Sequence, residues 1–348
     1  MIKTKVWAHR GASAYAPENT LEAFQLAVDE KVDGIELDVQ LTKDGKVVVL
    51  HDETLQRVSD GYGYVKDFSL EELKNLRFNK LHPEYADATI PTFKEVLQLL
   101  KDTDIMLNIE LKTGLFFYEG IEEQVIELVK RYGMEDRVWY SSFNHYSLQK
   151  VKSLNPIAKI GVLYSDGIYK PVDYAEKVGA QALHPAIYNL QYPDVIKECR
   201  EKGMKLHAWT ANSYKDIAHC IELGVDALIT NYPDRAKVFA TQNGDGVYPF
   251  ENPFSKNAGK EFYLFGAGYQ GQHFMKRFAE KYVPKKIVDN AEAKWGSKIG
   301  GIEIESPNCL RQGDCVVVAG NYFPEIIEQL KGMEITSYYV YDEQCDWT

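Results

Sequence analysis

Cysteine is scarce in this sequence, and its pattern excludes two common uses of the residue. The 348-residue chain has only five cysteines. The number is odd, and neither zinc-ligand spacing nor a tight disulfide framework is present. We therefore expect reduced, mostly structural thiols at Cys199, Cys220, Cys309, Cys315 and Cys345.

Positive charge is also in short supply. Lys and Arg number 40 against 51 Asp and Glu, which gives a formal net charge of −11. Proteins that bind nucleic acid or anionic membranes usually carry a basic surface, so we expect neither partner. A small anionic ligand would need cations placed locally around it.

Long apolar runs are missing as well. The N-terminal stretch MIKTKVWAHRGAS has too few apolar residues before charge returns to be a secretory signal or a membrane span. We expect a cytoplasmic protein without an integral membrane segment. Because 45% of the residues are hydrophobic, the chain can bury a large core, and its length suggests one large domain or two.

Strand-like and helix-like segments alternate over the first 240 residues. Amphipathic stretches, several of them ending at Gly or Pro, separate short runs of strand character. The expected strands are residues 5–9, 34–40, 104–112, 137–143, 159–164, 182–187, 205–210 and 226–230. Eight strand–helix repeats predict an α/β fold of the (β/α)8 TIM barrel type, whose catalytic groups lie where the strands end. Residues 46–103 form a longer crossover that is expected to cover part of the barrel mouth.

A change of composition marks the end of the barrel. We predict a barrel domain over 1–240, a linker rich in Gly, Asn and Pro over 241–258, and a small Rossmann-like α/β domain over 259–348.

The candidate site begins at the end of the first expected strand, where KVWAH is followed by Arg10 and Gly11. In the second strand, Glu36 and Asp38 are two residues apart, so they project from the same face at a spacing of about 6–7 Å. In the third, Glu110 and Lys112 share a face in the same way. Each pair alone is consistent with a solvated strand face or an ordinary ion pair. Three carboxylates directed at one point favour a hard divalent cation such as Mg²⁺ or Ca²⁺.

Histidine and further cations complete this pattern. His51 follows the apolar run KVVVL, and with His9 it forms a candidate acid–base pair, because the imidazole pKa lies nearest neutrality. Arg10 and Lys112 supply positive charge suited to a phosphate. Phosphoryl chemistry is the expected reaction class.

The segments AHRGASAYAPENTLEAF, GIELDVQLTKDGKVVVLHDETLQRVSDGYGYV, IPTFKEVL and NIELKTG resemble the successive motifs of the glycerophosphodiester phosphodiesterase family, and HAWTAN and LITNYPD continue the match over about residues 3–240. The resemblance implies that Glu36, Asp38 and Glu110 bind the metal, that His9 and His51 are catalytic, and that Arg10 and Lys112 hold the phosphate. It further implies that Glu18 and Asn19 brace the first loop, and that Trp209 and Phe143 form apolar walls near the substrate. For Trp209, simple packing at the barrel rim is the alternative.

The expected reaction is metal-dependent hydrolysis of a small-molecule glycerophosphodiester to glycerol 3-phosphate and an alcohol, through a cyclic phosphate if the glycerol 2-hydroxyl attacks. Three alternatives remain open: a lyase that stops at the cyclic phosphate, a lysophospholipase D-type activity, and a non-catalytic platform that binds a phosphorylated ligand. The loop GLFFYEG after Lys112 is placed to contact the leaving group, or else packs. We interpret His145, His184, His207 and His219 as structural or surface residues, with His207 able to point into the barrel mouth.

The C-terminal domain carries a second motif. Gly266, Gly268 and Gly271 form GxGxxG between an expected strand and helix, and Asp289 ends the next strand, where an acidic residue would meet a ribose. Two roles are consistent with this pattern: a nucleotide or nucleotide-sugar site, and docking or homo-oligomerisation.

Overall fold

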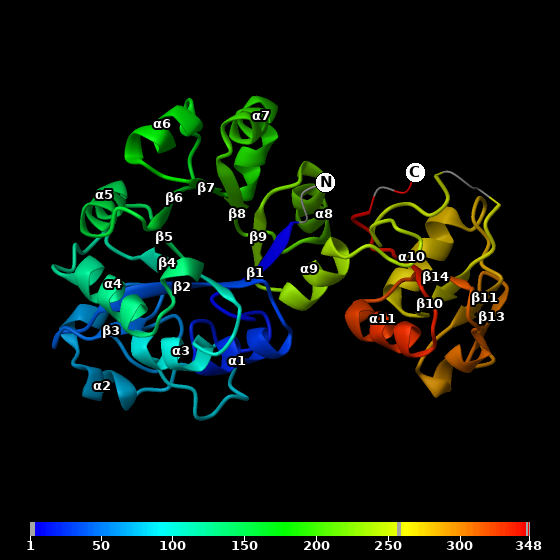
Figure 1. The fold of residues 1–348 in the computed structure, drawn as a ribbon. Helices are drawn as coiled ribbons and strands as arrows, with labels where there is room; N and C mark the ends of the chain where they lie inside the picture. Colours follow the sequence, from blue (N-terminus) through cyan, green and yellow to red (C-terminus); the bar gives the residue numbers. More distant parts are fainter. Residues whose placement is uncertain (1–3, 256–258, 346, 348) are drawn as a thin grey trace. The chain divides into compact units, whose positions relative to one another are not determined.

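The computed structural model describes residues 4–255, 259–345 and 347. The chain divides into two compact units, whose ribbons are drawn in Figure 1. The first contains the chain up to Asn212 together with Cys220–Pro233, and the second contains Ser213–His219 and the chain from Asp234 onward.

The first unit is a closed barrel of eight parallel strands, so the predicted fold class is confirmed. The strands are β1 (Lys5–His9), β2 (Gly34–Leu41), β4 (Met106–Leu111), β5 (Val138–Ser142), β6 (Lys159–Tyr164), β7 (Ala182–Pro185), β8 (Lys205–Ala208) and β9 (Ala227–Thr230). Each pairs in parallel with the next in this order, and β1 pairs with both β2 and β9, which closes the sheet. All eight carboxyl ends therefore meet at one mouth.

The helices of the barrel part of the chain start and stop at ordinary capping signals. Thr20 caps α1 by accepting from the Ala23 N–H, and Thr92 forms a capping box with Glu95 at α3. α6 and α7 begin with proline and end at left-handed glycines. The helices are α1 (Leu21–Asp29), α2 (Leu70–Lys74), α3 (Phe93–Leu100), α4 (Ile121–Arg131), α5 (His145–Leu154), α6 (Pro171–Val178), α7 (Pro193–Lys202), α8 (Tyr214–Leu223) and α9 (Pro233–Ala240).

The long crossover between β2 and β4 is an ordered excursion. β3 (Val47–Val49) runs antiparallel to β2, and α2 and α3 follow it. The excursion has its own apolar cluster, which includes Leu50, Leu55, Val65 and Phe78. Because β3 runs back along β2, the Leu50 N–H donates to the Asp38 carbonyl oxygen, and His51 is brought to the barrel mouth.

The second unit has a six-stranded sheet with the order β12-β13-β11-β10-β14-β15. Its elements are β10 (Tyr263–Phe265), α10 (Tyr269–Phe278), β11 (Lys286–Val288), β12 (Lys298–Ile299), β13 (Ile302–Glu305), β14 (Cys315–Val318), α11 (Phe323–Gly332) and β15 (Ser337–Val340). All pairings are parallel except that of β12 with β13. Phe254, from the expected linker, is buried in the core of this unit with Phe262 and Phe274.

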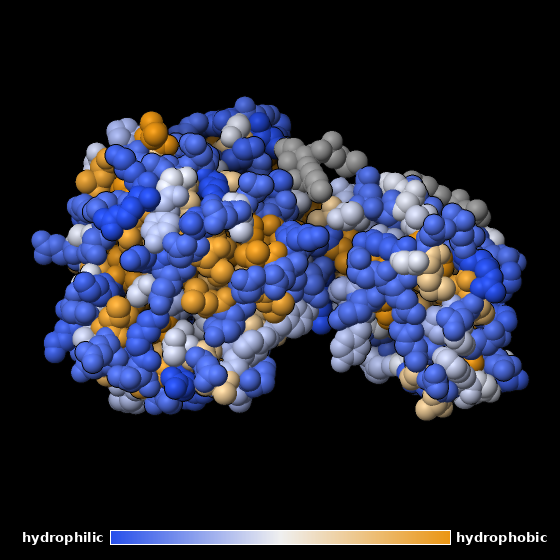
Figure 2. Space-filling view, turned by 60° about the horizontal axis from the view of Figure 1, so that its bottom comes forward, coloured by the Kyte–Doolittle hydropathy of each residue, from blue (hydrophilic) through white to orange (hydrophobic). Residues whose placement is uncertain are grey.

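The surface shown in Figure 2 is mostly hydrophilic on both units, with smaller groups of hydrophobic side chains between the polar ones. Among the residues that the structure describes, no helix is long and apolar enough to cross a membrane. The five cysteines are free thiols, as expected.

Candidate active site

The first βα turn places His9 and Arg10 at the mouth of the barrel. Arg10 has a φ of 56° and Gly11 a φ of 82°, so the chain turns sharply through two left-handed residues. A Cβ on Gly11 would lie 2.6 Å from the Ala23 carbonyl carbon. The Arg10 N–H donates to the Glu36 carboxylate at 3.1 Å, which holds the turn against β2. The glycine beside His9 and Arg10 therefore lets the turn pack on α1.

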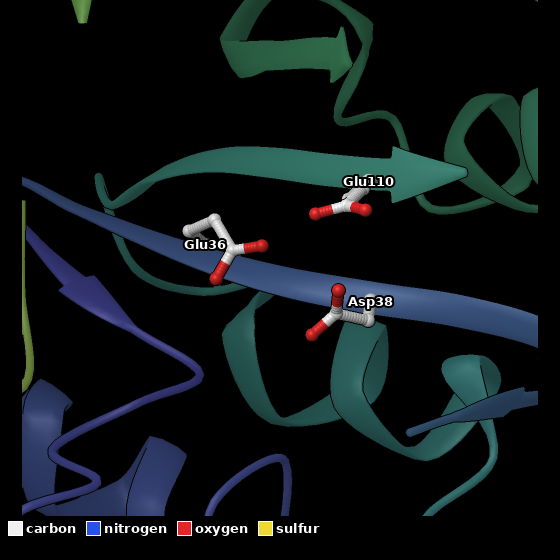
Figure 3. A group of neighbouring side chains, drawn as sticks. All are labelled: Glu36, Asp38 and Glu110. Atoms are coloured by element: carbon white, nitrogen blue, oxygen red, sulfur yellow. The ribbon is translucent and has the colours of Figure 1, made fainter. Parts of the chain in front are cut away.

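The three predicted carboxylates lie together. Glu36 and Asp38 extend from β2 and Glu110 from β4, and Figure 3 shows their carboxylates turned toward a common space. One oxygen from each lies within 4.8 Å of the others, and all three side chains are buried. The alternative of solvated carboxylates on a strand face is excluded by this burial.

The pKa shifts of the three carboxylates indicate that additional positive charge would stabilise the cluster. Burial, with Asp38 and Glu110 nearby, raises the pKa of Glu36 well above its usual value, and burial with Asp38 raises that of Glu110. Burial acts in the same sense on Asp38, but His51, Arg10 and Lys112 hold its pKa below the usual range. Asp38 Oδ1 has no hydrogen-bond partner among the described residues. These features fit a hard divalent cation, which takes oxygen ligands.

Two cations flank the carboxylates. The Lys112 ammonium donates to Glu110 at 2.9 Å and lies 3.9 Å from Asp38. Arg10 Nη1 donates to Glu18 at 2.9 Å, and Arg10 Nε lies 3.4 Å from Asp38. Asn19 donates to Asp38 at 2.8 Å, so Glu18 contacts Arg10 and Asn19 contacts Asp38.

The two histidines are held by different partners. His9 Nδ1 donates to Asn231 Oδ1 at 2.6 Å, which leaves Nε2 unprotonated, 3.9 Å from Glu36. Burial, with Arg10 beside the ring, lowers the pKa of His9 to about 3, so the imidazole is neutral at neutral pH. His51 Nδ1 lies 2.6 Å from Asp52 Oδ1, and this carboxylate fixes the ring orientation.

Arg57 is the main residue that sequence reasoning missed. It donates to Glu18 at 2.7 Å and to Asp52 at 2.6 and 2.9 Å, and so links the partner of Arg10 to the partner of His51. Although burial favours the neutral acid, Arg57 and Arg10 hold the pKa of Glu18 below its usual value. The available signal was weak: an arginine five residues after Asp52 in HDETLQR.

Gln40, also missed, supports the segment that carries His51. It is buried on β2, and its Nε2 donates to the carbonyl oxygens of Leu50, His51 and Asp52 at 2.8, 3.2 and 2.8 Å. Its Oε1 accepts from the Tyr118 hydroxyl at 2.8 Å. Within the GLFFYEG loop, Tyr118 is therefore hydrogen-bonded to β2, whereas Phe117 is 77% exposed.

A cavity of about 130 Å³ lies at the barrel mouth. Its polar lining includes His9, Arg10, Glu36, His51 and Glu110. Phe143 and Trp209 form an apolar part of the lining, with ring centroids 5.8 Å apart in an edge-to-face contact. The Trp209 indole also donates to the His184 carbonyl oxygen at 2.9 Å, so it packs and lines the cavity at once.

His184 and His207 are buried inside the barrel. His207 Nδ1 lies 2.8 Å from His184 Nε2, and both rings pack near Trp139. Burial lowers the pKa of His207 to about 3, so it is neutral. The structural interpretation holds for both, although His184 also lines the cavity. His145 is the first residue of α5, and His219 lies in α8.

Three of the four residues singled out in the second unit border one cavity. Gly266, Gly268 and Asp289 line a volume of about 350 Å³, and Gly271 lies in α10 directly behind the glycine turn. Asp289 follows β11, as predicted. Its carboxylate is already engaged, accepting from the Ala267 N–H at 2.7 Å and from Lys294 at 2.8 Å.

Comparison with known proteins gives a consistent result for the barrel. The sequence model of the glycerophosphoryl diester phosphodiesterase family matches residues 9–235. A glycerophosphodiester phosphodiesterase of Caldanaerobacter subterraneus is 47% identical over 234 residues, covering 67% of this chain and 96% of the relative. One from Bacillus altitudinis is 42% identical over 238 residues, covering 67% of this chain and 96% of the relative.

Comparison with solved structures agrees with the sequence comparison. An Oleispira antarctica phosphodiesterase, in complex with the product sn-glycerol-3-phosphate, has a TM-score of 0.63 and 31% identity, covering 67% of this chain and 95% of that chain. A Galdieria sulphuraria structure has a TM-score of 0.63 and 30% identity, covering 69% of this chain and 98% of that chain.

Proposed function

Because the chain belongs to the glycerophosphoryl diester phosphodiesterase family, we propose that its barrel hydrolyses glycerophosphodiesters to glycerol 3-phosphate and an alcohol with one divalent metal ion. In enzymatic class it is a phosphoric diester hydrolase. The observation that carries the proposal is the buried cluster of three carboxylates, two of which, Glu36 and Glu110, line one cavity with two histidines and Arg10. The sn-glycerol-3-phosphate bound to the Oleispira relative supports the same product for this chain.

Glu36, Asp38 and Glu110 are the residues that would hold the metal, either Mg²⁺ or Ca²⁺. Two features support this assignment: Asp38 Oδ1 has no hydrogen-bond partner among the described residues, and the pKa values of Glu36 and Glu110 are raised. When bound, the ion polarises the phosphate and offsets the negative charge that develops on it. Arg10 and Lys112 are the cations that orient the phosphate in the proposal, and Phe143 and Trp209 form apolar walls beside the substrate.

His9 is the better candidate for the base. Its imidazole is neutral, and its Nε2 is free of a proton because Nδ1 donates to Asn231. We propose that His9 Nε2 accepts the proton of the attacking hydroxyl. His51, oriented by Asp52, protonates the departing alcohol. The glycerol 2-hydroxyl is favoured as the first nucleophile, because an intramolecular group has a high effective molarity. Water then opens the cyclic phosphate.

A coupled assay of glycerol 3-phosphate release tests this function. The substrates are glycerophosphodiesters with choline, ethanolamine and inositol head groups, each with and without EDTA, together with a lysophospholipid. We expect release from at least one deacylated diester and its loss in EDTA. Head-group release is followed in parallel, because a lysophospholipase D leaves lysophosphatidic acid and no glycerol 3-phosphate. Head-group release from the lysophospholipid alone would support the lysophospholipase D-type activity, and calorimetric binding without turnover of any substrate would support the non-catalytic platform.

Arg57 is expected to act as a positioning residue. Arg57→Gln removes the link between Glu18 and Asp52 and leaves His51 and Arg10 less well oriented. Because loss of a supporting partner typically costs 10–100-fold, we expect kcat to fall by about 10-fold with a smaller change in KM, measured by steady-state kinetics.

Arg131→Gln is the matched control, since it removes an exposed helix pair with Glu127. Equal kinetics for Arg57→Gln and Arg131→Gln would show that Arg57 only contributes surface charge. Partial rescue by Arg57→Lys would separate its charge from its bidentate geometry.

A further inference from the structure

We propose that the second unit binds the diphosphate of a nucleotide in the cavity at the carboxyl ends of its strands. The cavity has a volume of about 350 Å³, within the usual range of small-molecule sites. It is lined by Gly266 after β10, Asp289 after β11 and Ala319 after β14. This site is independent of the proposed activity of the barrel.

The strand order places the cavity where such sheets bind ligands. From β10 the chain adds β11 and then β13 on one side, and it returns to add β14 and β15 on the other. The order therefore reverses between β10 and β14, which pair in parallel through Tyr263–Phe265. In open parallel sheets the crevice at this reversal is the ligand site.

Glycine is present at the three positions of the motif for different physical reasons. Gly266 has a φ of +116°, and a Cβ there would lie 2.3 Å from the Ala319 carbonyl oxygen. A Cβ on Gly271 would lie 1.9 Å from the Gly266 carbonyl oxygen. Packing of the sheet, turn and helix thus explains both.

Gly268 has no such explanation. Its φ of −85° and ψ of −157° are extended, and a Cβ there would meet nothing within 4 Å. The residue nonetheless lines the cavity. A side chain at position 268 would fill the open space at the start of α10. Glycine at this position therefore leaves room for a ligand to approach the backbone.

The start of α10 offers donors to that ligand. Gly268 is its N-cap and provides no side-chain hydrogen bond. The first N–H groups of a helix lack intrahelical acceptors, and the helix dipole makes this end positive. Together with the open space at Gly268, this geometry suits the oxygens of a diphosphate.

The charges of the lining favour a diphosphate esterified at both ends over a triphosphate. Lys294 is the one Lys or Arg that lines the described cavity, and it is paired with Asp289 at 2.8 Å, while Glu325 adds an acidic group. Most of the stabilisation must then come from backbone N–H groups. Dinucleotides and nucleotide-sugars, whose diphosphate is esterified at both ends and carries two negative charges, match this lining best.

Groups for the nucleoside are also present. Asp289 Oδ1 accepts from the Ala291 N–H at 2.8 Å and retains a lone pair for a ribose hydroxyl. Asp289 therefore braces the glycine turn and is able to accept from a ribose as well. Tyr269 and Tyr322 line the cavity and are 68% and 75% exposed, which offers flat faces to a base.

Calorimetric titration of the full chain with NAD⁺, UDP-glucose, CDP-choline and ATP tests the proposal. We expect saturable 1:1 binding of a dinucleotide or of a nucleotide diphosphate ester, and weaker binding of ATP. Gly268→Val should weaken that binding at least about 10-fold, because its side chain fills the approach to the backbone.

Gly332→Val is the control, since Gly332 on α11 also has open space at its Cβ but does not line the cavity. Both variants should keep the melting temperature and the barrel's phosphodiesterase rate. The proposal is overturned if no diphosphate ester of the panel binds, or if Gly268→Val binds as tightly as Gly332→Val. Because the phosphodiesterase rate is measured separately, failure here is distinguishable from failure of the proposed barrel activity.

Discussion

His9→Ala is expected to lower kcat by about 100-fold or more, because general acid–base catalysis by a positioned side chain contributes at least that much. The neutral ring has its Nε2 3.9 Å from Glu36, and in the proposed mechanism this nitrogen takes the proton of the attacking hydroxyl. His51→Ala should cause a loss of similar size, because the leaving alcohol then departs without a proton. Steady-state glycerol 3-phosphate release gives both values.

His145→Ala serves as the matched control for these variants. His145 is hydrogen-bonded to the Tyr174 hydroxyl and to the Leu163 carbonyl oxygen, and it does not line the cavity. We expect its kcat to stay within about twofold of the wild-type value, since it touches no reacting group. Turnover of His9→Ala near the wild-type rate would refute the assignment of His9.

Removal of divalent metal is expected to lower kcat/KM by at least about 100-fold, because a Lewis acid on the phosphate is worth several kcal/mol in the transition state. Readdition of Mg²⁺ or Ca²⁺ should restore the rate, and the more effective ion identifies the preferred metal. Asp38→Asn should reproduce the loss and should also weaken the metal-induced rise in melting temperature. The melting temperature is therefore a second readout of metal binding, and it does not depend on turnover.

Glu127→Gln is the control for the carboxylate variant. Glu127 lies on α4 and pairs with Arg131 on an exposed helix face. Its variant should retain both the rate and the metal effect on melting. Full activity after thorough chelation would contradict the proposed role of Glu36, Asp38 and Glu110.

The strand periodicity predicted much of the barrel and of the carboxylate cluster. Residues two apart on a strand share a face, so Glu36 with Asp38 was predictable, and the barrel brings Glu110 beside them because β4 pairs with β2. β7 ends at Pro185, earlier than predicted, because a 3-10 helix begins at Ile187. Such boundaries depend on local turns that the apolar pattern does not specify.

Contacts between distant segments were not predictable in the same way. Asn231 reaches His9 only because β9 closes the barrel against β1, and no local pattern marks that pairing. Arg57 lies in the crossover, whose path depends on the separate apolar cluster around Leu55 and Phe78. In the second unit, the position of Asp289 was correct, but its bond to the Ala267 N–H shows that it also supports the glycine turn.

Phosphorus NMR of the products tests the central claim most directly. The wild-type chain is incubated with glycerophosphodiesters that carry choline, ethanolamine and inositol head groups, with Mg²⁺ or Ca²⁺ and, in parallel, with EDTA. Metal-assisted hydrolysis by the His9–His51 pair predicts that the diester signal is replaced by that of glycerol 3-phosphate, with any cyclic phosphate only transient, and that His9→Ala and the EDTA sample leave the diester unchanged. Accumulation of the cyclic phosphate as the final product would identify a lyase, and equal conversion with and without metal would contradict the account.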